Sequence, residues 1–118
     1  MNREKMVQSV RVLLGDSETN YRCFDDECLL KGLEDAVAET NVINPRNQQR
    51  FTLDTAPDAW MACVPFGAAA HCLRQHADQL EASDSKASAT YRSLANSHDR
   101  EFKNAAKRVM ANRPASAR

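Results

Sequence analysis

The most reactive side chains in the chain are thiols and imidazoles, and these are also the usual ligands of zinc. They belong to Cys23, Cys28, Cys63, Cys72, His71, His76 and His98. Structural zinc sites need closely spaced pairs such as CxxC. The spacing from Cys23 to Cys28 and that from Cys63 to Cys72 are both longer than this. His76 follows Cys72 by four residues, which supplies two ligands at most. We therefore expect no metal, no cofactor and, because the thiols should be kept reduced, no disulfide.

No arrangement in the sequence is typical of catalysis. The glycines stand alone at positions 15, 32 and 67, so there is no glycine-rich loop to bind phosphate. Neither a metalloprotease motif, nor a nucleophile elbow, nor a paired carboxylate motif occurs. Each histidine has the chemistry of a general base, but none lies in a sequence context that indicates this role. We expect a protein that is not an enzyme.

The stretch from Ala56 to Leu80 is the most apolar long run, and the other elements are organised around it. Residues three and four apart share a helix face, and this spacing forms one stripe along the run. The stripe consists of Trp60, Cys63, Val64, Gly67, Ala70, His71 and Arg74. Because the opposite side is apolar too, we predict a central helix covered by other helices, or packed partly against another subunit. Its Gly67–Ala70 segment has so little bulk that a neighbouring backbone can approach it.

Pro65 interrupts this central helix. Inside a helix, proline cannot bond to the carbonyl of Met61 and clashes with that turn. Two arrangements avoid the clash: a kink between Met61 and Pro65, or a first turn at 57–63 separated from a main helix that starts near Pro65. We expect one kinked helix over 57–80, with Thr55 as its N-cap.

Three more helices are predicted around the central one. Residues 3–14 have apolar side chains at helical spacing, with Asn2 as N-cap and Gly15 as the C-terminal stop. Residues 25–41 start at an aspartate N-cap that follows an apolar residue, in the pattern of a hydrophobic staple. Residues 86–111 form the last helix, roughly 39 Å long at about 1.5 Å per residue, which is longer than a small bundle needs.

The predicted apolar stripe of the last helix is Tyr91, Leu94, Ala95, His98, Phe102, Ala105, Ala106 and Val109. We expect the far end of this helix to project from the bundle or to dock on something else. Residues 112–118 are predicted to form a flexible basic tail, which leaves 1–111 as a single helical domain.

Size and charge limit the class of protein further. A chain of 118 residues corresponds to one domain, and sixteen basic residues cancel sixteen acidic ones. This balance argues against nucleic-acid binding driven by bulk charge. No run approaches the roughly 18 apolar residues of a membrane span, and the first ten residues lack the apolar core of a signal peptide. The sequence thus predicts a small all-α bundle of about four helices that stays in the cytosol.

The loop at 45–54 is long for a helical bundle, in which connections of two to eight residues are usual. It has no helical period and ends in an alternation of apolar and polar residues at 51–54. Contact with a partner and a plain surface loop both remain open for this segment.

Four segments together carry a family resemblance. They are Phe24–Leu30 (FDDECLL), Phe51–Trp60 (FTLDTAPDAW), Gly67–Leu73 (GAAAHCL) and Lys107–Pro114 (KRVMANRP). In this helix order they resemble the head–tail connector, or adaptor, proteins of tailed bacteriophages. Pro65 is unexpected in that pattern.

The resemblance implies an all-helical structural protein of the virion neck, assembled in the cytoplasm of the bacterial host. Its copies would form a homo-oligomeric ring, commonly of twelve, below the portal protein. The ring would continue the channel through which DNA passes without sequence-specific binding, and would receive the next neck or tail protein. The alternative is a small cytosolic helical regulator that binds DNA or another protein.

Two sets of contact residues follow for the connector. We expect subunit–subunit contacts from Arg46, Arg50, Phe51 and Leu53. We expect portal contacts from Phe102, Lys103, Lys107, Arg108, Arg113 and Arg118. For Phe51 and Leu53 the other possibility is that they fold back over the end of their own bundle.

Overall fold

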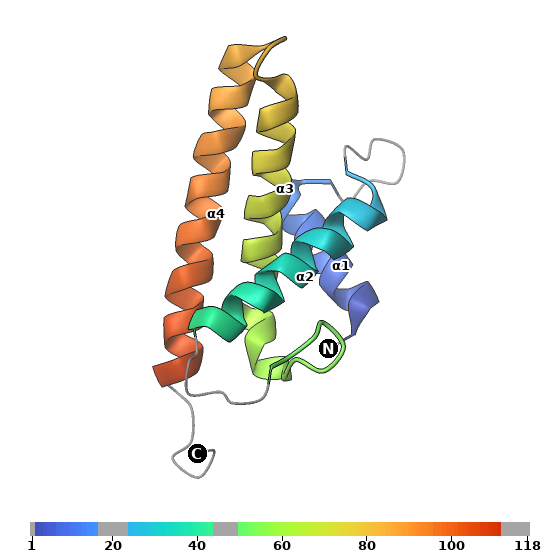
Figure 1. The fold of residues 1–118 in the computed structure, drawn as a ribbon, viewed down its shortest axis with the longest axis vertical. Coiled ribbons are helices and arrows are strands. Elements are labelled where there is room, and N and C mark those ends of the chain that lie inside the picture. The colour runs from blue at the N-terminus through green and yellow to red at the C-terminus, as the bar shows by residue number, and fades with distance from the viewer. Residues whose placement is uncertain (1, 17–23, 44–49, 112–118) are drawn as a thin grey trace.

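The computed structural model describes residues 2–16, 24–43 and 50–111, and this part of the chain is an all-α bundle (Figure 1). The α-helices are α1 (Arg3–Leu14), α2 (Asp26–Ile43), α3 (Val64–Leu80) and α4 (Ser85–Ala111), with a short 3₁₀ helix, η1 (Asp58–Ala62). The predicted fold class is therefore confirmed. None of the helices in these ranges is both long and apolar enough to cross a membrane.

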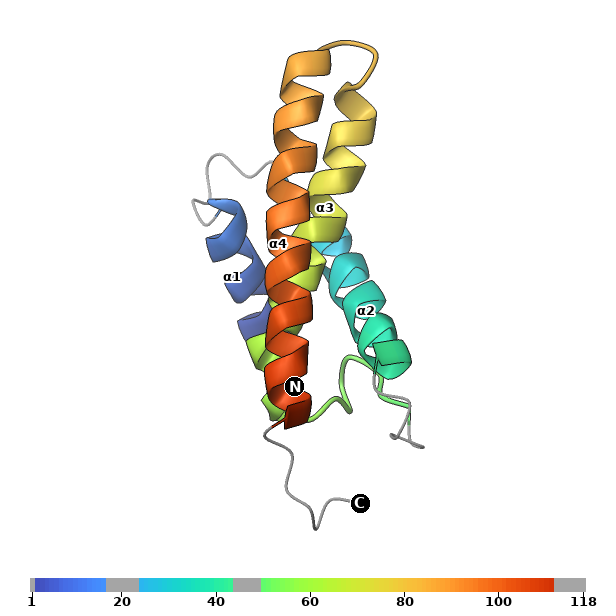
Figure 2. The same cartoon turned by 90° about the vertical axis from the view of Figure 1, so that its left-hand side faces the viewer.

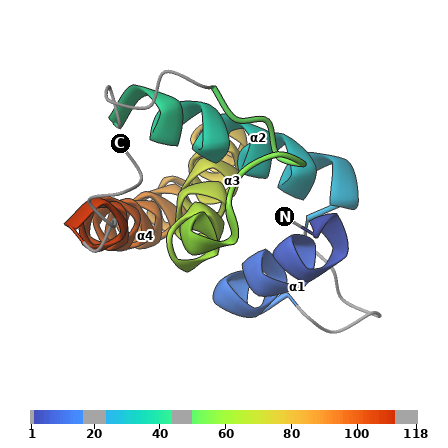
Figure 3. The same cartoon turned by 90° about the horizontal axis from the view of Figure 1, so that it is seen from below.

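The central position predicted for the third helix is confirmed, because α3 contacts α1, α2 and α4 (Figure 3). It forms an antiparallel hairpin with α4, and α1 and α2 lie on the other sides of it. The buried side chains of the four helices and of the loop before η1 join in one core cluster. One hydrophobic core thus holds the described part of the chain together.

Both ends of α1 follow the local rules. Asn2 accepts a hydrogen bond from the Lys5 N–H through its side chain, at 3.2 Å. Gly15 ends the helix in the left-handed conformation, with φ 66°, where a side chain would be strained. The start of α2 is just as regular, because Asp25 Oδ1 accepts the Cys28 N–H at 2.7 Å. These predicted caps are confirmed.

The prediction of one kinked helix over 57–80 is wrong. The chain forms η1, leaves helical geometry at Cys63 (φ −120°), and starts α3 at Val64. Pro65 therefore lies in the first turn of α3, where its missing N–H has no helical partner to lose. The structure thus has the other of the two arrangements considered, in which a first turn, η1, is separate from the main helix, α3.

Thr55 does not cap a helix, contrary to prediction. Its Oγ1 accepts the Thr52 N–H at 2.8 Å, while the Thr52 carbonyl accepts the N–H groups of Thr55 and Ala56. These bonds close a turn before η1. The N-cap position of η1 is instead Pro57, which makes no side-chain capping bond.

The small residues of α3 bring neighbouring helices very close. A Cβ built on Gly67 would lie 2.9 Å from the Cβ of Ala36 and 3.0 Å from Cδ1 of Phe102. A Cβ on Gly32 of α2 would lie 3.0 Å from the carbonyl oxygen of Ala68. At both glycines a side chain could therefore be added only if the neighbouring atoms moved away. The close approach expected along Gly67–Ala70 is thus confirmed.

The end of α4 that projects is not the one expected. Its C-terminal half packs into the core, where Phe102, Ala105 and Ala106 are buried. The N-terminal half extends with the end of α3 beyond α1 and α2 (Figure 1). Within this tip, Ser88 donates a hydrogen bond to the Ala77 carbonyl at 2.8 Å. Leu94, which was predicted on the buried stripe, is 45% exposed.

Substitution of Gly67 by alanine tests this close packing. In an open helix the change would stabilise by up to about 1 kcal/mol, because alanine is the better helix former. Here the added methyl overpacks the contact with Ala36 and Phe102, so we expect a loss of about 1–3 kcal/mol in the free energy of unfolding. Urea denaturation followed by circular dichroism measures the sign. A more stable variant would show that the three helices are not in tight contact.

Candidate functional site

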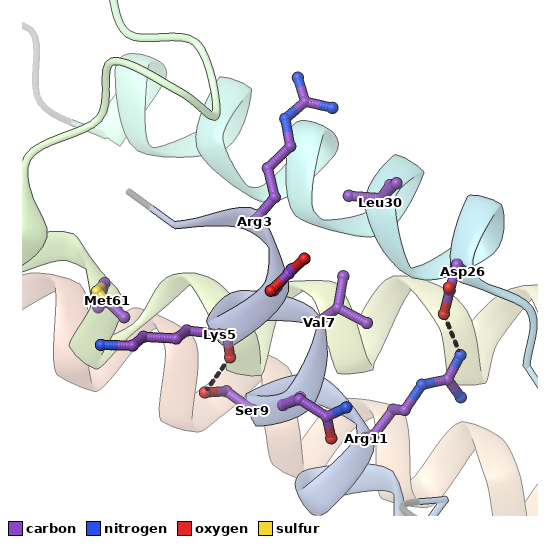
Figure 4. Close-up of a pocket in the computed structure, with 10 residues that line it drawn as sticks. Arg3, Lys5, Val7, Ser9, Arg11, Asp26, Leu30 and Met61 are labelled. Carbon is purple, nitrogen blue, oxygen red and sulfur yellow. Dashed lines mark hydrogen bonds and ion pairs between the residues drawn. The ribbon is translucent and has the colours of Figure 1, made fainter. Parts of the chain in front are cut away.

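One hollow on the surface is an open groove between α1 and the start of α2 (Figure 4). Its volume is about 720 Å³. Apolar side chains from Val7, Leu30 and Met61 line it, together with charged and polar groups of α1. The hydroxyl of Ser9 donates to the carbonyl oxygen of Lys5 at 2.9 Å. Among the described lining residues, no histidine or cysteine accompanies this serine.

Arg11 lies at the edge of this groove but serves the fold. Its side chain is 1% exposed, and Nη1 donates to Asp16 Oδ2 and to the Phe24 carbonyl oxygen, both at 3.0 Å. Nη2 donates to Asp26 at the start of α2. Asp16 Oδ2 also accepts the Phe24 N–H at 3.2 Å. This Arg11 network therefore ties the end of α1 to the start of α2.

The sequence analysis missed Arg11. The pattern that could have indicated its burial is its position on the apolar side of α1, one turn after Val7 and next to the buried Val10. Long cations are almost never fully buried unless they are paired. The nearby carboxylates of Asp16 and Asp26 supply the charge that makes burial possible.

The described cysteines are free thiols. Cys28 and Cys72 face each other from α2 and α3, with 3.8 Å between their sulfur atoms. Burial raises the pKa of both Cys63, to about 12, and Cys72, so neither is a ready thiolate. Cys23 lies outside the described residues.

The histidines pack in three different surroundings. The ring of His76 stands edge-on between Phe24 and Tyr91, at centroid distances of 5.5 and 4.7 Å. His71 Nε2 lies 3.8 Å from a carboxylate oxygen of Glu39. Burial lowers the pKa of His98, which Glu101 partly opposes. Within the described ranges, no three residues of the metal-binding types come together.

The residues expected at a subunit interface are divided by the structure. Arg50 is exposed, Phe51 is half-buried against the core, and Leu53 is only 3% exposed within it. Asn41 holds the loop in place, because its side chain donates to the Phe51 carbonyl at 2.9 Å and accepts the Phe51 N–H at 3.0 Å. Leu53 therefore supports its own bundle, and Arg50 and Phe51 are the members with accessible surface.

Arg46 lies outside the described residues, as do Arg113 and Arg118 of the set expected to contact the portal. Of the others, Phe102 is fully buried at the contact with Gly67, so its ring is not on the surface. Lys103 is exposed and pairs with Asp99 at 2.9 Å. Lys107 and Arg108 are exposed on the last turns of α4.

Asp99 lies within α4, where its carboxylate faces Arg74 of α3 as well as Lys103. Burial alone would raise the pKa of this carboxyl group, but the ammonium of Lys103 and the guanidinium of Arg74 outweigh it. The pKa of Asp99 is therefore lowered, and the group stays ionised down to a lower pH than a free aspartate.

Replacement of Arg11 by methionine tests the role of its buried network. The variant leaves the carboxylate of Asp16 buried without its cation, so we expect a loss of about 3–5 kcal/mol in the free energy of unfolding. The matched control is Arg3→Met, which breaks an exposed pair with Asp54 and should cost less than about 1 kcal/mol. Similar losses in the two variants, measured by urea denaturation, would contradict this role.

The loop can be tested at two neighbouring positions. Leu53→Ala should lower the free energy of unfolding by about 2–5 kcal/mol, because it opens a cavity in the core. Arg50→Glu changes an exposed residue and should shift stability by less than about 0.5 kcal/mol. Thermal unfolding of the two variants side by side makes the comparison. A neutral Leu53→Ala would mean that the loop does not pack on the bundle.

Comparisons with protein-family models, with curated proteins and with solved structures found no match to this chain.

Proposed function

We propose that the protein is a structural subunit of a bacteriophage neck, a head–tail connector that forms a ring below the portal. The observation that carries the proposal is the shape of the described part, which measures 52 × 26 × 18 Å. The α3–α4 hairpin accounts for the long dimension (Figure 2). A connector must hold one protein above it and another below it, and an elongated subunit presents two separate ends for that purpose.

The two ends differ in chemistry, which suits two different partners. The hairpin tip carries three acids, Asp78, Glu81 and Asp84, beside the cations Lys86 and Arg92, and Arg92 is neutralised by its pairs with Asp78 and Glu81. The other end carries Lys107 and Arg108 on the last turns of α4. In the proposal the basic end contacts the portal and the tip faces the downstream neck or tail protein.

Ring closure requires a head-to-tail interface, in which two different patches of the subunit meet. The loop before η1 supplies one patch, with Arg50 as a charged group and Phe51 as a half-buried aromatic anchor. Arginine and aromatic residues are the types that most often dominate the energy of protein interfaces. About twelve copies would close the ring, and DNA would pass through its channel. No catalytic step belongs to this function.

Removal of residues 112–118 tests the portal contact. Since α4 ends at Ala111, we expect the truncated chain to keep its helical content and melting temperature. Its binding to the portal protein of the same virion should weaken at least tenfold. Native mass spectrometry and negative-stain microscopy, with and without portal, measure ring formation and attachment.

The control is Lys31→Gln, which removes an exposed cation on α2 far from this end of the chain and should leave attachment unchanged. Full attachment of the truncated chain would count against the portal contact. A protein that stays a monomer or dimer and prefers one DNA sequence over others would support the alternative, a small helical regulator.

A further inference from the structure

The outward side of α4 carries cations along its whole length. Alternating steps of three and four residues keep one face of a helix in register. Starting from Lys86, such steps pass through Ala89, Ser93, Asn96, Arg100, Lys103 and Lys107, all of them exposed. Arg92 and Arg108 flank this row. We call the six cations the α4 basic face: Lys86, Arg92, Arg100, Lys103, Lys107 and Arg108.

No element of the described chain covers this face. Figures 2 and 3 show α4 at the edge of the molecule, with α3 on its inner side. Between the cations the row carries only small or neutral residues, and the nearest exposed acid is Glu101, which lies two turns before Arg108 on the same side of α4. The acids of α4 are Asp99 and Glu101, and Asp99 is turned toward Arg74 of α3.

Most of these charges are also uncompensated. Arg92 pairs with acids of the hairpin tip and Lys103 pairs with Asp99. Among the described residues, the other four cations have no ion pair. The helix α2 has the opposite balance, with five acids against one lysine. The chain's zero net charge therefore conceals two oppositely charged sides.

The composition of the face argues against several partners. Protein interfaces are enriched in aromatic residues, methionine and arginine and depleted of lysine, serine and alanine; this face has arginines but no aromatic residue or methionine, and most of its other members are of the depleted types. A helix that lies in a membrane surface needs an apolar side to insert, and here that side is buried against α3. Single-stranded nucleic acids stack on aromatic rings, yet Phe102 of α4 points into the core.

Double-stranded DNA fits the remaining features. The face extends over about 32 Å, at about 1.5 Å per residue. Duplex DNA offers about one phosphate charge per 1.7 Å of its axis, so phosphates are available along the whole face. Lysine, arginine, serine and asparagine side chains are the usual contacts to phosphate oxygens, and small residues between them let the backbone come close.

We propose that the α4 basic face binds the phosphate backbone of double-stranded DNA without reading its sequence. In the proposed connector, which this inference deepens, α4 would then line the DNA channel. Lys103 and Lys107 would contact DNA where the channel passes from the portal into the ring, so that the basic end of α4 serves both contacts. The binding itself needs neither the ring nor the portal, so it can be measured on the isolated protein.

The test uses fluorescence anisotropy with two labelled duplexes of about 30 base pairs and unrelated sequence. With four unpaired cations as phosphate contacts, the affinity should fall about 10²-fold between 50 and 200 mM salt. The two duplexes should bind within about twofold of each other. The variant Arg100→Gln/Lys103→Gln/Lys107→Gln should bind at least tenfold more weakly at 50 mM salt. Its slope of log affinity against log salt should be smaller by about 1.8, because Arg100 and Lys107 are two of the four unpaired cations.

The matched control is Lys5→Gln/Lys31→Gln/Arg50→Gln, which removes the same charge from exposed positions outside α4. We expect it to weaken binding less than threefold. Equal losses in both variants would show that bulk charge is responsible, and no loss in the α4 variant would show that DNA binds elsewhere; either result overturns the proposal. Competition by polyglutamate as strong as that by DNA of equal charge would overturn it too, in favour of an acidic protein partner.

Failure here and failure of the connector function are distinguishable. Rings that form and attach to the portal without this DNA affinity would refute only the DNA contact. DNA binding by a chain that never forms rings would support the contact and refute the connector.

Discussion

The architecture depends on how closely α2 and α4 approach the small residues of α3. At Gly67 the Cβ of Ala36 and the ring of Phe102 occupy the space that a side chain would need. Such contact gives a small protein the dense packing of larger cores, because every atom of the narrow interface has near neighbours. This close packing also explains how one core cluster with few aromatic residues can stabilise the whole bundle.

Beyond this core the hairpin is held by other means. Ala77 and Ser88 are buried between α3 and α4, and a hydrogen bond joins them. Arg92 bridges the two helices on the outside through Asp78 and Glu81. The α3–α4 hairpin therefore projects beyond α1 and α2 and presents polar side chains on its surface, where another protein can bind. This is what the proposed connector requires of a subunit that joins two partners.

Charge distribution, rather than net charge, connects this architecture to the proposed partners. Six cations gather on the outward side of α4, of which only Arg92 and Lys103 form ion pairs among the described residues, and negative charge gathers on α2. A count over the whole chain gives zero, which argued against nucleic-acid binding. The field near a surface depends on local groups, because salt screens interactions beyond about 8–10 Å. The face of one helix can therefore attract DNA although the protein as a whole is neutral.

The sequence alone determined the features that act within one or two helical turns. The caps at Asn2, Gly15 and Asp25 and the helical periods were predictable because each depends on residues three or four positions apart. They were enough for the all-α class and for the central place of α3. The cationic row on α4 was also present in the sequence, but only its last turns were recognised.

The tertiary structure decided everything that requires knowledge of the neighbours. Pro65 was compatible with a kink or a new start, and only the packing of α3 selected the start. From the sequence, Phe102 and Leu53 could contact a partner or pack on their own bundle, and the structure shows that both are buried in the core. Arg11 is buried between Asp16, which directly follows the end of its own helix, and Asp26 at the start of α2, which only the fold brings near. Burial and charge pairing depend on contacts between distant parts of the chain, and a local pattern does not contain them.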